Sequence, residues 1–315
     1  KIAFLFPGQG SQQVGMGKEL AMMYPVAQKT FDEADEALGE KLSQLCFAGP
    51  EEKLRMTEVT QPAILTVSVA AQRVLREKGI VASFAAGHSL GEYSAHVVAG
   101  TLGLADAVRA VRNRGKYMQE AVRVGDGAMA AILGMPLPAL EELCAETRNG
   151  EVCEPANINS PEQIVISGHK PAVERAAALA KTRGAKRAVM LPVSAPFHCS
   201  LLKPAAERLE RDLRKLQFHE PQIPVISNVD AAQIKTGDQA RDALVRQVTG
   251  AVQWEKSMRA LIAEGVEQFV EVGPGKVLCG LMRQIDRSRT CLNAGDEMSL
   301  QKTLNLLGQV RSGAF

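Results

Sequence analysis

The chain has 315 residues, and its apolar fraction of 46% and charged fraction of 23% are ordinary for a soluble globular enzyme. A core of this size needs no disulfide or metal to hold it together. The net charge of +2 gives no reason to expect nucleic acid as a partner, and no apolar run approaches the ~20 residues that cross a bilayer, so no membrane association is expected.

The cysteines show neither a C-x-x-C pair nor the spacing of zinc ligands. The six are Cys46, Cys144, Cys153, Cys199, Cys279 and Cys291. We interpret them as reduced thiols of a cytoplasmic protein, and no metal site is expected. The apolar opening, residues 2–6, is too short for a secretory signal and runs directly into Pro7-Gly8. This also favours a cytoplasmic location.

The first part of the chain alternates between strand and helix patterns. Residues 2–6 and 83–87 are predicted to form short buried strands. Thr60 is predicted to cap a helix that has Pro62 near its first turn. The predicted helices cover residues 16–38, 61–78, 91–99 and 105–122. Alternation of this kind indicates an α/β fold, in which helices cover a parallel sheet.

The middle of the chain has a different order of elements. Strands are predicted at 128–133, 152–158, 163–167 and 188–191, with helices at 137–148 and 171–183. The order β-α-β-β-α-β is that of a ferredoxin-like unit. We therefore predict an inserted small subdomain over residues 126–193. The large α/β domain, expected to be hydrolase-like, is then built from residues 1–125 and 194–315.

The last part returns to the pattern of the large domain. The predicted elements are a helix over 201–216, a strand near Val225, helices over 240–248 and 256–264, and a strand over 268–272. The loop Gly273-Pro274-Gly275-Lys276 lacks P-loop spacing, is interpreted as a structural turn, and leads into a further helix. Residues 311–315 show no pattern.

Gly87-His88-Ser89-Leu90-Gly91 matches G-x-S-x-G at the point where a predicted strand gives way to a helix. Such a turn lifts a serine side chain above the sheet, and the glycines let the strand and helix backbones approach closely. The N–H groups of the helix N-terminus favour developing negative charge beside the serine. Ser89 is therefore the candidate nucleophile; the alternative is a serine that only caps the helix.

Four motifs occur in an order that resembles the malonyl-CoA:acyl carrier protein transacylase family, over nearly the whole chain. They are Phe6-Pro7-Gly8-Gln9-Gly10-Ser11-Gln12, Gly87-His88-Ser89-Leu90-Gly91-Glu92, Ala195-Pro196-Phe197-His198 and Glu271-Val272-Gly273-Pro274-Gly275. That family joins a large hydrolase-like α/β domain to a small ferredoxin-like one. The chain departs from the family pattern at Ala251, where the family often has proline before the Val-x-Trp segment.

The resemblance assigns roles around the nucleophile. It makes His198 the general base and gives the main-chain carbonyl of Gln247 the task of orienting that histidine. The sequence itself offers no triad acid, since neither Asp106 nor Asp126 is placed like one. Leu90 follows the nucleophile, so its N–H is one candidate for the oxyanion hole. The resemblance gives the second oxyanion donor to Gln9.

The resemblance also indicates the acyl group. Arg114 would hold the free carboxylate of a malonyl thioester with two parallel hydrogen bonds, although periodicity alone does not separate it from Arg109 and Arg112. Phe197 before the histidine favours an unbranched acyl chain. His88, Asn157 and Asn159 match positions that line the cleft in the family; the alternative is a structural role for His88 and a turn before Pro161 for the asparagines.

The expected partners are malonyl-CoA and an acidic acyl carrier protein with its phosphopantetheine thiol. A cluster of positive charge could steer that carrier, or form a solvated helix end: Lys181, Arg183, Lys186 and Arg187. We expect a monomer that supplies fatty acid biosynthesis without a metal or redox cofactor. The alternatives are a malonyl transferase of polyketide synthesis or malonate decarboxylase, a serine thioesterase or esterase, and an inactive docking module.

Overall fold

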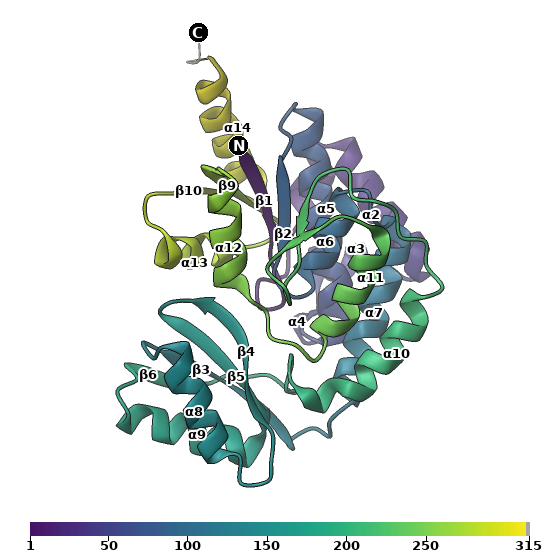
Figure 1. Ribbon diagram of the computed structural model, residues 1–315. Coiled ribbons are helices and arrows are strands. Elements are labelled where there is room, and N and C mark those ends of the chain that lie inside the picture. The colour runs from purple at the N-terminus through teal and green to yellow at the C-terminus, as the bar shows by residue number, and fades with distance from the viewer. Residues whose placement is uncertain (313–315) are drawn as a thin grey trace.

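The computed structural model describes residues 1–312, with side chains up to residue 308, and contains two sheets in separate lobes (Figure 1). The larger lobe holds a six-stranded sheet in the order β10-β9-β1-β2-β7-β8, in which only β8 pairs antiparallel. The smaller lobe holds an antiparallel four-stranded sheet in the order β4-β5-β3-β6. The predicted α/β fold class, a hydrolase-like large domain with a ferredoxin-like subdomain, is confirmed.

The strands of the large sheet come from both ends of the chain. They are β1 (Ile2–Phe6), β2 (Phe84–Gly87), β7 (Val225–Ile226), β8 (Gln233–Ile234), β9 (Gln268–Val272) and β10 (Thr290–Ala294). The helices of this lobe are α1 (Lys18–Met23), α2 (Pro25–Leu38), α3 (Leu42–Ala48), α4 (Glu51–Leu54), α5 (Thr57–Glu77), α6 (Gly91–Val98), α7 (Leu104–Glu120), the 3₁₀ turn η1 (Ser200–Leu202), α10 (Lys203–Leu213), α11 (Gly237–Gln247), α12 (Trp254–Ala263), α13 (Val277–Ile285) and α14 (Glu297–Ser312).

The small sheet and its two helices lie between residues 127 and 190, inside the range 126–193 predicted for the subdomain. The elements are β3 (Gly127–Leu133), α8 (Leu137–Thr147), β4 (Cys153–Ser160), β5 (Gln163–His169), α9 (Lys170–Thr182) and β6 (Arg187–Met190). They have their own buried apolar cluster, in which β3, β4 and β5 pack against α8 and α9. The order β-α-β-β-α-β is the predicted one.

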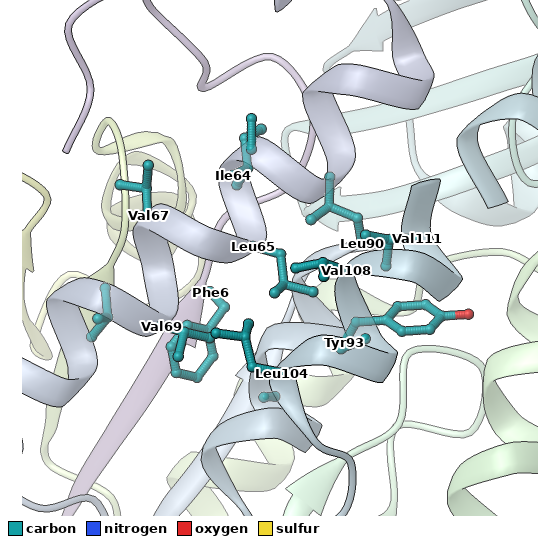
Figure 2. Close-up of a cluster of buried hydrophobic side chains, with 14 of the residues drawn as sticks. Phe6, Ile64, Leu65, Val67, Val69, Leu90, Tyr93, Leu104, Val108 and Val111 are labelled. Carbon is teal, nitrogen blue, oxygen red and sulfur yellow. The ribbon is translucent and has the colours of Figure 1, made fainter. Parts of the chain in front are cut away.

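Helix α5 forms the centre of the large lobe. Apolar residues are buried on nearly all sides of it, as expected for a helix that other helices and a sheet enclose. Figure 2 shows Leu65 and Val69 of α5 beside Phe6 of β1 and Val108 of α7. This packing fixes α5, α6 and α7 relative to the end of β1, and these are the elements that surround the nucleophile turn.

Several predicted boundaries are wrong. The helix expected over 16–38 is broken at Tyr24 into α1 and α2, because the residue before Pro25 takes an extended backbone. The helix expected from Gln61 begins at Thr57, and Thr60 does not cap it: the Thr60 hydroxyl donates to the carbonyl of Leu54. The elements α3, α4, β8, β10 and α14 were not predicted.

The prediction of six reduced thiols is wrong for one pair, because Cys279 of α13 and Cys291 of β10 are joined by a disulfide. The other four cysteines are free and buried. Of the pattern-free residues 311–315, α14 takes in the first two, and the last three lie outside the described residues. Among the described residues, no helix has the length and apolar character needed to cross a membrane.

Candidate active site

The turn between β2 and α6 holds Ser89 in a backbone conformation that L-residues rarely adopt, with φ of +54°. Its neighbours explain why the chain tolerates this turn. A Cβ atom on Gly87 would overlap the backbone of Gly91, and one on Gly91 would overlap the carbonyl group of Phe6. Both glycines are therefore required for the close approach of strand and helix that the sequence motif predicted.

His198 lies against the Ser89 hydroxyl and is itself held by a backbone carbonyl. Its Nε2 is 2.7 Å from Ser89 Oγ, and its Nδ1 is 2.8 Å from the carbonyl oxygen of Gln247. Because a carbonyl only accepts, Nδ1 must carry the proton, which leaves the lone pair of Nε2 facing the hydroxyl. This is the tautomer that a general base for Ser89 requires.

Burial and charge keep the imidazole neutral. His198 is 3% exposed, and burial together with the nearby Arg114 guanidinium lowers its pKa to about 3. Burial favours the neutral imidazole, because a buried imidazolium would lose its hydration. Among the described residues no carboxylate binds His198, and the carbonyl at the end of α11 occupies the place that a triad acid would take.

Arg114 lies at the bottom of the same site. It is 1% exposed, and its Nη2 donates to Ser89 Oγ at 3.1 Å and to Gln247 Oε1 at 2.9 Å, while Nη1 donates to Gln61 Oε1 at 2.7 Å. Among residues 1–308 this guanidinium has no carboxylate partner. Arg109 and Arg112, which the sequence alone left equivalent, pair instead with Asp106 and Glu40.

These groups open into a cavity of about 500 Å³. Its lining includes Gln9, His88, Leu90, Asn157 and Phe197, together with Ser89, Arg114 and His198. Among the described residues, neither the Gln9 nor the Leu90 backbone N–H donates to a protein group. Two free donors beside the hydroxyl are the arrangement that an oxyanion hole needs.

Asn159 differs from its prediction. It is not among the residues that line this cavity. Its Oδ1 accepts from His88 Nε2 at 2.8 Å, and its amide nitrogen donates to Gln163 at 3.0 Å. His88 also packs against the ring of Trp254. Asn159 therefore lies behind His88 and holds that ring at the wall of the cavity, while Asn157 contributes directly to the wall.

The basic cluster lies on the small lobe, at the end of α9 and along β6, and none of its members lines the cavity. Arg183 pairs with Glu146 at 2.6 Å, and Lys186 pairs with Glu162 at 2.8 Å. Lys181 and Arg187 are exposed. Two of the four positive charges are thus already balanced on the protein surface.

Three buried side chains of the site were not predicted: Gln61, Glu92 and Asn228. Asn228 follows β7; its Oδ1 accepts from the Ser89 N–H at 2.8 Å, and its amide nitrogen donates to the Gly87 carbonyl at 2.6 Å. Glu92 follows the nucleophile motif, and burial raises its pKa to about 7. The position of Glu92 directly after Gly91 was a usable signal in the sequence, whereas no pattern marks Asn228.

Elsewhere, a larger cavity of about 760 Å³ between residues 13–20 and 274–276 contains neither Ser89 nor His198. Within the described part of the chain, no group of three or more His, Cys, Asp or Glu side chains could hold a metal ion. The 500 Å³ cavity is the one that brings Ser89, Arg114 and His198 together.

A family model described as "Acyl transferase domain" matches residues 3–309. The malonyl CoA-acyl carrier protein transacylase of Escherichia coli (strain K12) is 52% identical over 97% of this chain and 99% of its own length. The chain belongs to the malonyl-CoA:acyl carrier protein transacylase family. It is thus an acyltransferase, and the expectation that it resembles this family is confirmed.

Solved structures of this transacylase family are similar throughout. The malonyl CoA-acyl carrier protein transacylase from Coxiella burnetii has 43% identity and a TM-score of 0.95, covering 97% of both chains. A malonyl-transacylase in complex with a type II PKS acyl-carrier protein has 46% identity and a TM-score of 0.94, covering 97% of this chain and 99% of its own. The large and small lobes therefore follow the arrangement of the transacylase family.

Proposed function

We propose that the chain moves a malonyl group from malonyl-CoA to the phosphopantetheine thiol of an acyl carrier protein, through a malonyl ester on Ser89. The observation that carries this proposal is the buried guanidinium of Arg114, 3.1 Å from the nucleophile and without a carboxylate partner among residues 1–308. An acyl group that ends in a carboxylate supplies the missing partner. An uncharged acyl group provides no such partner for Arg114.

In the first half-reaction, His198 Nε2 takes the proton of Ser89 as Oγ attacks the thioester carbonyl carbon. The Gln9 and Leu90 N–H groups stabilise the oxyanion, a contribution of about 3 kcal/mol for each donor in comparable sites. The C–S bond then breaks, and His198 returns the proton to the leaving CoA sulfur. The Gln247 carbonyl keeps the tautomer correct while the imidazolium exists.

The second half-reaction reverses these roles. His198 takes the proton of the carrier thiol, whose sulfur attacks the ester carbonyl. The bond to Ser89 Oγ breaks, and the serine recovers the proton from His198. Arg114 holds the malonyl carboxylate in both halves, so the ester stays in one orientation between them. All of these steps use protein groups and the two substrates.

The carrier protein follows from the relatives, which are named for it, and from the solved complex of a malonyl-transacylase with its acyl-carrier protein. We propose that this chain serves a fatty-acid carrier and works as a monomer. The complexed carrier belongs to a type II polyketide synthase, so a purified carrier of each kind is the appropriate second substrate. Transfer to a polyketide carrier alone would contradict the proposed pathway.

Intact-protein mass spectrometry after brief exposure to malonyl-CoA, acetyl-CoA or methylmalonyl-CoA tests the reaction. We expect a malonyl adduct on the wild-type chain, no adduct on Ser89→Ala, and loss of the adduct when the carrier protein is added. Free malonate formed in the presence of carrier would instead indicate a thioesterase. Absence of any malonyl adduct would refute the proposed function.

A further inference from the structure

The hydrogen bonds beneath the nucleophile converge on one buried carboxylate that the mechanism does not use. Glu92, on the first turn of α6, is fully buried. Its Oε2 accepts from the Gln247 amide nitrogen at 2.8 Å and from the backbone N–H of Asn228 at 3.1 Å. Its Oε1 has no hydrogen-bond partner, and the nearest histidine nitrogen, Nε2 of His96, is 3.9 Å away.

The partner that Glu92 holds is the residue that orients the general base. Gln247 ends α11, so its carbonyl is one of the free acceptors at the helix C-terminus, and it accepts from His198. Its side chain lies between the Arg114 guanidinium and the Glu92 carboxyl group: the amide oxygen accepts from Arg114 Nη2 at 2.9 Å, and the amide nitrogen donates to Glu92 Oε2. Glu92 Oε2 is the closest of three acceptors around the amide nitrogen, the others being the Ser89 carbonyl at 2.9 Å and Asn228 Oδ1 at 3.1 Å, and it is the one carboxyl group among them.

The same amide group reaches the nucleophile. Gln247 Nε2 also lies 2.9 Å from the Ser89 carbonyl oxygen, and Asn228, the second partner of Glu92, binds the Ser89 N–H. If the amide turned over, its NH₂ group would face the Arg114 guanidinium, donor against donor. The observed orientation therefore keeps the amide oxygen toward Arg114 and the amide nitrogen toward the Ser89 backbone.

We propose that Glu92 is a positioning residue for the transfer reaction: by accepting from the Gln247 side chain and the Asn228 backbone, it holds the end of α11 that orients His198. The inference rests on the proposed roles of Ser89 and His198. Oε2 accepts both bonds whether or not Oε1 carries a proton, so the role belongs to the acceptor atom. Glu92 acts on the histidine only indirectly, through Gln247, whereas a triad acid would bind the histidine itself.

The test measures how fast a fluorophosphonate labels Ser89, because this reagent needs the serine and its base but carries no carboxylate for Arg114. Glu92→Met removes the acceptor at similar size, and we expect labelling to slow roughly 10- to 100-fold, the range for losing a hydrogen bond to a buried charged group. Glu92→Gln keeps an oxygen that can accept the same bonds, and we expect it to restore most of the rate. The final stoichiometry of labelling separates this effect from misfolding, which lowers the number of reactive sites.

Two further variants complete the design. Gln247→Met keeps the backbone carbonyl but removes the amide; we expect it to slow labelling like Glu92→Met, and the double variant to be no slower than either one. Glu271→Met is the matched control: Glu271 is also fully buried, and its Oε2 accepts from the Cys279 N–H at the start of α13, away from the site. We expect this control to label at the wild-type rate.

Four results would overturn the inference: wild-type labelling by Glu92→Met, equal slowing by Glu92→Gln, additive losses in the double variant, or equal slowing by the Glu271 control. If Glu92→Met does not fold, wild-type labelling by Gln247→Met at full stoichiometry overturns it as well. Failure of the wild-type chain to be labelled at Ser89 refutes the proposed function instead, so the two failures are distinguishable.

Discussion

Replacing Arg114 with alanine is expected to abolish the preference for malonyl over acetyl groups. The guanidinium is buried, and the carboxylate of a malonyl group on Ser89 would enter the same buried space. Without the arginine, that carboxylate is a buried charge with no partner. Breaking one side of a buried ion pair costs about 3–5 kcal/mol, which corresponds to about 10²- to 10⁴-fold in the rate of malonyl transfer.

The acetyl group provides the internal comparison. Arg114 also donates to Gln61 and Gln247, so its removal disturbs the site for every substrate. The same disturbance affects transfer from an acetyl thioester, but the acetyl group has no carboxylate that could interact with Arg114. The ratio of the two kcat/KM values, from single-turnover acylation with malonyl-CoA and acetyl-CoA, isolates the interaction with the carboxylate.

Arg109→Ala is the matched control, since Arg109 lies on the same helix, pairs with Asp106 and is exposed. We expect this variant to keep the wild-type ratio. Equal losses of malonyl and acetyl transfer in Arg114→Ala would refute the reasoning, because the arginine would then support the fold of the site without recognising the carboxylate.

Three further changes probe other parts of the chain. Gly91→Ala places a methyl group against the carbonyl at the end of β1, and we expect it to lower stability by about 1–3 kcal/mol or more, measured by urea unfolding; an unchanged midpoint would contradict this. Burial lowers the pKa of His96 from 6.5 to about 3, so the contribution of His96 to stability falls as the pH drops below 6.5, by up to ~1.4 kcal/mol per pH unit. The buried His198 contributes the same slope and Glu92 and Glu271 the opposite one, but these groups are present in both proteins. We therefore expect unfolding curves at pH 7 and pH 5 to show a smaller loss of stability in His96→Gln than in the wild type, and an equal loss would contradict this. Phe197→Ser enlarges the cavity beside Ser89, and we expect the ratio of methylmalonyl to malonyl adduct to rise about 10-fold by mass spectrometry, whereas an unchanged ratio would remove Phe197 from specificity.

The nucleophile turn was predictable because its constraints are local. Gly87 and Gly91 must lack side chains where this strand meets this helix so closely, so the geometry explains why the motif has glycine at both positions. The ferredoxin-like order was predictable for the same reason, since short strands and helices with clear periodicity follow one another directly. Arg114 required the family resemblance, because a helical arginine that enters a site looks like one that faces solvent.

The groups behind the reacting atoms were not predictable. Asn228 lies 139 residues from Ser89 in the chain, and its amide is useful because β7 and β2 are neighbours in the sheet. Nothing local marks it. Asn159 was assigned to the cavity wall, yet which side of His88 it occupies depends on how the two lobes meet. Such contacts are set by tertiary packing and not by spacing along the chain.

The neutral side chain of Gln247 suits the proposed role of Arg114. A carboxylate at the position of the Gln247 amide would form an ion pair with the guanidinium 2.9 Å away, and a substrate carboxylate would then have to displace it. An amide accepts from the same guanidinium without neutralising it. Placing the carboxylate of Glu92 beyond that amide keeps an acceptor in the network and leaves the positive charge available to the substrate. The backbone carbonyl of Gln247, which orients His198, carries no net charge either, so neither contact of this residue competes with a substrate carboxylate for Arg114.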